Sequence, residues 1–197
     1  TGAYLFNYYN KYNRAIAAIN SFLANADKLL TGDKLTKYKG EAYFMRAFNY
    51  FWLAQLYGNV PIVKDDPFKA DFKTPMAKST RAEVLAFVYQ DLDAAIAALP
   101  DDAYSSGHAV KTTAQGYKVR ALLFEKKYAE AAALAKQIID GNKYSLNPDY
   151  DANFYKAGQN AGNEIMFSVK FLLPNIEHAD AALNVTMQTW GGYQGTQ

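Results

Sequence analysis

The stretch "YKGEAYFMRAFNYFWLAQLYGNVPIV", residues 38–63, consists mainly of aromatic and aliphatic side chains. Arg46 and Gln55 interrupt its apolar run, which argues against a membrane span. At 100° per residue the apolar side chains cover most of the helix circumference, as in a helix packed on several sides. We therefore expect a central helix that ends at Gly58, with Pro61 preventing its continuation.

The composition describes a chain without an extreme of charge. Its 197 residues suit one domain, half of them are hydrophobic, a fifth are charged, and the net charge is +2. Such a balance gives no field that would recruit nucleic acid or anionic lipid. The chain has no cysteine, which excludes disulfides, thiolate metal sites and a cysteine nucleophile within it. The opening residues "TGAYLF" do not resemble a signal peptide.

Residues 3–30 carry apolar side chains at steps of three and four, the spacing of an amphipathic helix. Asn20 lies on the apolar stripe, so we expect it to be buried and bonded to a neighbouring backbone group. Gly32 suits the left-handed position that follows a helix end. The first two helices are thus predicted to be consecutive.

Residues 64–79 contain two prolines and scattered charge and are predicted to form a loop. A third helix follows, because Thr80 can cap its first turn while Glu83 returns a hydrogen bond to the cap nitrogen. Its apolar positions recur at helical spacing until Pro100. We expect this helix to bury one stripe.

Residues 111–146 are predicted to form two helices joined at "EKKY", similar to one tetratricopeptide unit. The match to such repeats is partial, because Val119 stands where they usually have a small residue. The later segment "NEIMFSVKFLL" is rich in β-formers and suggests a short strand or an extended segment. The fold class is therefore mainly α, a tetratricopeptide-like scaffold of helix pairs with long loops and a short extended segment near the C-terminus.

Candidate metal ligands are sparse. His108 and His178 each lie in a polar, loop-like context without a second ligand at zinc-site spacing. In "NPDYDANF", Asp149, Asp151 and Asn153 alternate as in a calcium loop, but Phe154 replaces the required Gly and no Glu stands at the twelfth position. We expect neither a metal nor a cofactor.

No catalytic motif emerges from the sequence. The acidic pairs Asp65-Asp66 and Asp101-Asp102 lie in predicted loops, where exposed, solvated carboxylates are the commoner case. The chain contains no nucleophile elbow, phosphate loop or dinucleotide fingerprint. We therefore expect a protein that is not an enzyme.

The sixteen tyrosines and two tryptophans of the chain are expected to be mostly structural. Trp190 and Tyr193 differ, because "TWGGYQGTQ" is rich in glycine, lacks periodicity and is predicted to be a loop that presents rings outward. Flat exposed rings suit the C–H faces of sugars. Alternatively, Trp190 closes one end of the scaffold.

These residues together resemble a known family, the SusD-like and RagB-like proteins. The family's segment has the general form Gly-Glu-Ala, an aromatic residue, Arg-Ala, an aromatic-rich run, Tyr-Gly and Val-Pro. The matching positions are Glu41, Ala42, Arg46, Ala47, Tyr50, Leu53, Tyr57, Gly58, Val60 and Pro61. The flanking segments "YNRAIAAIN", "RAEVLAFVYQDLDAAIAALP" and "NEIMFSV" follow in the family's order, so the resemblance covers nearly the whole chain.

The resemblance implies a single SusD-like helical domain over residues 1–197, forming the N-terminal and central part of a longer protein. SusD-like proteins are lipoproteins on the outer face of the outer membrane of Bacteroidetes. They bind glycans without cleaving them and pass oligosaccharides to a SusC-like TonB-dependent transporter. Glu41 and Arg46 are then expected to hold neighbouring helices, and Gly58 and Pro61 to shape the helix end.

For ligand contact we select Trp190 and Tyr193, with Tyr4 and Asn7 near the N-terminal edge as further candidates. Two other functions stay open at this point. A RagB-like branch would bind an extended peptide, and a helical-repeat adaptor would bind only protein. No nucleic-acid partner is expected, and membrane association would come only from a lipid anchor outside this sequence.

Overall fold

The computed structural model describes residues 2–69, 76–105, 107–154 and 163–168. The chain divides into two units, Thr1–Phe167 and Ser168–Gln197, and the fold described below is that of the first. Its elements in chain order are α1 (Gly2–Leu29), α2 (Gly32–Tyr57), α3 (Arg81–Ala98), α4 (Lys111–Phe124), α5 (Tyr128–Asp140) and the short 3-10 helix η1 (Tyr150–Phe154). No strand occurs among the described residues, which confirms the mainly α fold.

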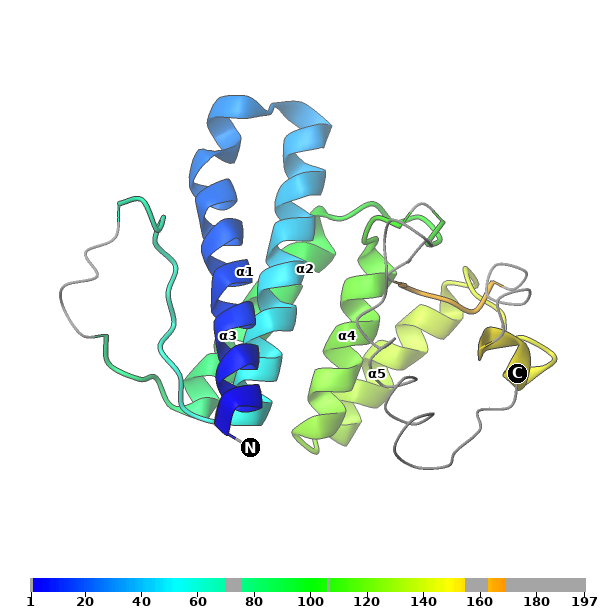
Figure 1. Ribbon diagram of the computed structural model, residues 1–197. Coiled ribbons are helices and arrows are strands. Elements are labelled where there is room, and N and C mark those ends of the chain that lie inside the picture. Colours follow the sequence, from blue (N-terminus) through cyan, green and yellow to red (C-terminus); the bar gives the residue numbers. More distant parts are fainter. Residues whose placement is uncertain (1, 70–75, 106, 155–162, 169–197) are drawn as a thin grey trace, which may run out of the picture. The chain divides into compact units, whose positions relative to one another are not determined.

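The first two helices form an antiparallel hairpin (Figure 1). Only Leu30 and Thr31 separate them, and Gly32 has φ +60°, the left-handed conformation expected at this position. In the described part of the chain, no helix has both the length and the apolar content that crossing a bilayer requires.

Helix α2 is the central element, as the opening stretch of the sequence predicted. It packs against α1, α3 and α4. Its buried residues lie on several sides and are Gly40, Ala42, Phe44, Arg46, Ala47, Asn49, Tyr50, Phe51, Leu53 and Ala54. The helix ends at Gly58, which has φ +70° and donates its N–H to the Ala54 carbonyl at 3.1 Å.

The chain beyond Gly58 is held in extended form against the first three helices. Val60 forms an isolated antiparallel bridge with Ser79, and Pro61 follows it. The Tyr50 hydroxyl accepts a hydrogen bond from the Val63 N–H at 2.8 Å and lies 3.1 Å from the Val63 carbonyl. Burial raises the pKa of Tyr50 to about 12, so this hydroxyl is neutral at physiological pH.

Arg46 is buried and joins three helices. Its Nε and Nη2 donate to the two Asp91 carboxylate oxygens at 2.7 and 2.9 Å, and Nη1 donates to Asn20 Oδ1 at 2.9 Å. The Asn20 amide in turn donates to the Val63 carbonyl at 2.8 Å, so the expected bond from Asn20 to a backbone group is confirmed. The guanidinium also lies over the Phe87 ring, 5.0 Å from its centroid.

Glu41 also contacts a neighbouring segment. Its two carboxylate oxygens lie 3.1 Å from His108 Nδ1, in the loop between α3 and α4. The Glu41 side chain is about one-fifth exposed, whereas His108 is about half exposed. Glu41 therefore connects α2 to the loop before α4, whereas the resemblance implied that it holds neighbouring helices.

Helices α3 to α5 begin and end where their sequence signals lie. Thr80 and Glu83 form the expected capping box, with Thr80 N–H donating to Glu83 Oε2 at 2.7 Å. Helices α4 and α5 form the predicted pair (Figure 1). Lys126 lies in the turn between them and has φ +58°, a left-handed conformation. Arg81 links this turn to the start of α3 through both Glu125 oxygens.

One expectation about the irregular segments needs revision, and another is settled between its two alternatives. Asp66 is buried, with 7% exposure, and accepts hydrogen bonds from the Phe68 N–H and the Asn25 amide, so the predicted exposure of this carboxylate was wrong. Residues 163–168 form no strand, and residues 163–167 lie extended against α4, where Thr113 Oγ1 donates to the Met166 carbonyl at 2.8 Å. The extended alternative is the one observed for these residues.

Replacing Arg46 with Ala should lower the free energy of unfolding by about 3 kcal/mol or more, because Asp91 would remain buried without its counter-ion. Chemical denaturation measures this change. The matched control is Lys39→Ala on the same helix, which removes a more exposed pair with Asp27 and should cost less than about 1 kcal/mol. Equal midpoints for the two variants would contradict the structural role of Arg46.

Candidate functional site

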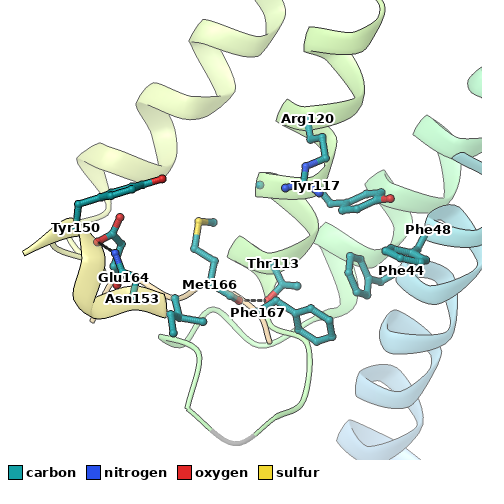
Figure 2. A pocket seen from close by; sticks show the side chains of 12 residues that line it. Phe44, Phe48, Thr113, Tyr117, Arg120, Tyr150, Asn153, Glu164, Met166 and Phe167 are labelled. Atoms are coloured by element: carbon teal, nitrogen blue, oxygen red, sulfur yellow. Dashed lines mark hydrogen bonds between the residues drawn. The ribbon is translucent and has the colours of Figure 1, made fainter. Parts of the chain in front are cut away.

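A pocket of about 510 Å³ lies between α2, α4 and the segments around η1 and residues 164–167 (Figure 2). Its volume is in the range typical of small-molecule sites. The residues that line it are Phe44, Phe48, Thr113, Gly116, Tyr117, Arg120, Tyr150, Asn153, Glu164, Ile165, Met166 and Phe167.

One face of α4 forms a wall of this pocket. Thr113, Gly116, Tyr117 and Arg120 stand at positions i, i+3, i+4 and i+7, so their side chains share one helix face. Gly116 permits a close approach, because a Cβ atom there would lie 2.8 Å from Met166 Cε. The wall therefore combines an aromatic ring, a cation and a contact that holds the 164–167 segment.

Aromatic rings form the apolar floor. The Tyr117 ring lies 5.8 Å from Phe44 and 5.2 Å from Phe48, measured between centroids. Phe167 meets Phe44 edge to face at 5.4 Å. Burial raises the pKa of the Tyr117 hydroxyl, which is therefore neutral at physiological pH.

The opposite side of the pocket is polar. Glu164 Oε2 accepts hydrogen bonds from the Asn147 N–H at 2.8 Å and from the Asn153 amide at 2.9 Å. These bonds lower the pKa of Glu164, so its carboxylate is ionised near neutral pH. Tyr150 lies beside it with 70% of its surface exposed (Figure 2).

Arg120 supplies positive charge at the α4 side. Its guanidinium lies 5.9 Å from the centroid of the Tyr117 ring, a cation–π arrangement. The side chain is exposed, and within the described ranges no carboxylate pairs with it. A ligand in the pocket would therefore meet rings, one cation and one anion.

The calcium-like sequence around Asp149 serves a local turn. Asp149 Oδ1 accepts the Asp151 N–H at 3.1 Å, and Asn153 bonds Glu164 and Asn147. Across the described residues, no three His, Cys, Asp or Glu side chains gather as a metal site would require.

Of the ligand contacts selected from the sequence, the structure describes the side chain of Asn7 alone. Trp190, Tyr193 and His178 lie outside the described residues. Tyr4 belongs to α1, but its side chain is also outside them, and Asn7 is exposed on α1 without lining the pocket.

Sequence reasoning missed the residues that line the pocket. The spacing of Thr113, Gly116, Tyr117 and Arg120 was available as a signal, because residues three and four apart share one helix face. Nothing in the local sequence of Glu164 indicates its position, which depends on long-range bonds to Asn147 and Asn153.

Comparison with known proteins assigns the family. The model of the SusD-like family described as "Starch-binding associating with outer membrane" matches residues 1–123. The chain therefore belongs to the SusD-like family, as the sequence resemblance implied. The SusD-like protein P2 of Formosa agariphila is 30% identical over 164 residues, which are 81% of this chain and 31% of that protein.

Solved structures agree on the fold. A SusD-like carbohydrate-binding protein from Bacteroides fragilis NCTC 9343 is 25% identical, with a TM-score of 0.77 over 84% of this chain and 33% of its own. A laminarin-binding SusD-like protein, 22% identical, has a TM-score of 0.67 over 76% of this chain and 35% of its own. The chain thus spans about a third of the length of the relatives it matches.

Two helix glycines, Gly40 in α2 and Gly116 in the pocket wall of α4, should change the stability of the fold differently when replaced by Ala. At Gly116 the new Cβ meets the flexible end of Met166, so the gain in helix propensity, about 1 kcal/mol, should leave stability unchanged or raised. At Gly40 it meets Leu99 Cγ at 3.0 Å and Ala98 Cβ at 3.1 Å, so overpacking should cost about 1–3 kcal/mol. Thermal unfolding of both variants tests this ranking, and a more stable Gly40→Ala would refute it.

Proposed function

We propose that this protein binds oligosaccharides at the cell surface without cleaving them and passes them to a SusC-like TonB-dependent transporter. Family membership supports the class of ligand, and the aromatic and polar pocket between α2 and α4 carries the proposal for this chain. Rings offer flat faces for sugar C–H groups, while Glu164 and Arg120 offer hydrogen-bonding groups for hydroxyls.

The pocket favours binding over hydrolysis. Glycoside hydrolysis commonly uses two carboxylates on either side of the scissile bond. Among the described lining residues only Glu164 carries a carboxylate, and its Oε2 already accepts two hydrogen bonds that keep it ionised. A carboxylate that stays ionised and accepts two hydrogen bonds is a poor general acid, because it has no proton to donate.

The proposed location is the outer face of the outer membrane, with a lipid anchor outside this sequence. The family description, which includes association with the outer membrane, supports this location. Delivery to a transporter would require a protein partner at that membrane, and co-purification of a SusC-like barrel with the full-length protein tests it.

Tyr150→Ala should weaken oligosaccharide binding about tenfold, because an exposed ring at the pocket is lost. Isothermal titration against plant, host and microbial oligosaccharides measures the effect. Tyr128→Ala is the matched control, since Tyr128 is also an exposed tyrosine, at 61%, but does not line the pocket.

The same panel separates the alternatives. Equal affinities of the Tyr150→Ala and Tyr128→Ala proteins would remove this pocket as the site. Trp190→Ala and Tyr193→Ala belong in the panel too, because both residues stay proposed ligand contacts. A co-purified peptide, with no oligosaccharide bound, would contradict the proposal in favour of the RagB-like function.

A further inference from the structure

We infer that the pocket between α2 and α4 selects oligosaccharides in which one acidic sugar adjoins a neutral sugar. The carboxylate of the acidic sugar would lie at Arg120 and the hydroxyls of its neutral neighbour at Glu164. This inference rests on the proposed function and names the class of glycan that the same site would take.

The first step is the unpaired charge of Arg120. The charge of Lys118 on the same helix is compensated within the protein, since Lys118 pairs with Asp93. Arg120 has no such partner among the described residues, and it lines the pocket. A cation left without an acid at a concave site is available to a negatively charged ligand.

The second step is the chemistry of the guanidinium. Its planar fork matches a carboxylate with two parallel hydrogen bonds. The Tyr117 ring lies next to it, with 5.9 Å between the guanidinium carbon and the ring centroid. This cation–π contact favours a guanidinium position at the pocket before a ligand arrives, which lowers the entropic cost of binding.

The third step is the placement of Glu164. Figure 2 shows Arg120 on α4 and Glu164 beside Tyr150, with Met166 between them in the view. The bonds from Asn147 and Asn153 hold the Glu164 carboxylate in its charged form. This end of the pocket accepts hydroxyl donors and repels a second carboxylate.

The two ends together define a charge pattern for the ligand. One negative group is favoured at the Arg120 end and disfavoured at the Glu164 end. A neutral oligosaccharide offers Arg120 only hydroxyls and leaves its charge without a counter-ion, and a polyuronate places a charge against Glu164. An oligosaccharide that bears a single uronic acid next to a neutral residue satisfies both ends.

Three trisaccharide probes test this pattern by isothermal titration of the chain. They are xylobiose bearing one glucuronic acid, neutral xylotriose and trigalacturonic acid. The singly acidic probe should bind about tenfold more tightly than either of the others. Its advantage over xylotriose should shrink as salt is added, because the selecting contact is between charges.

Two substitutions assign the selectivity to its residues. Arg120→Gln should abolish the preference for the singly acidic probe over xylotriose, whereas Lys136→Gln, which removes a positive charge from α5 outside the pocket, should preserve it. Glu164→Gln should improve the binding of trigalacturonic acid several-fold relative to the singly acidic probe, because the charge that repels a second carboxylate is removed. Thermal unfolding of each variant shows that the fold is retained.

The outcomes separate this inference from the function on which it rests. If xylotriose binds as well as the singly acidic probe, or if Arg120→Gln leaves their ratio unchanged, the inference is overturned while oligosaccharide binding stands. If the wild-type chain binds none of the probes and no member of the wider oligosaccharide panel, both the inference and the proposed function are overturned.

Discussion

The buried guanidinium of Arg46 sets the arrangement on which the rest of the scaffold depends. A charge in the protein interior is tolerated only where its hydrogen-bonding groups are satisfied, and Arg46 satisfies three of its donors with Asp91 on α3 and Asn20 on α1. Asn20 then holds the Val63 carbonyl, so the segment after α2 joins the same network. Three helices and one extended segment thus share a single set of polar contacts.

The same contacts orient the pocket. Phe44 and Phe48 each lie two residues from Arg46, which is about 200° around the helix axis. Because Arg46 faces α1 and α3, these rings must face the other side, where they meet Tyr117 of α4. The polar network around Arg46 therefore determines which aromatic side chains form the floor of the pocket, although the network and the pocket lie on opposite faces of α2.

The sequence predicted most of the scaffold because its signals are local. The capping box at Thr80 and the turn at Lys126 each depend on a few adjacent residues, and the structure confirms both. Burial of Asp66 was mispredicted, because its partners Asn25 and Phe68 include one 41 residues away. The position of Trp190 stays a prediction, since the described residues do not include it.

The pocket was harder to predict than the scaffold because it joins three separate parts of the chain. Its α4 wall follows from helical spacing. Glu164, in contrast, belongs to an extended segment that is held against α4 by the hydrogen bond from Thr113 to the Met166 carbonyl and by the close approach of Met166 to Gly116. The helix wall supplies a cation and a ring, while the irregular segment supplies the opposing anion. Changes in the irregular segment would therefore alter the charge opposite Arg120 without disturbing the helices, as expected where a rigid scaffold carries variable loops.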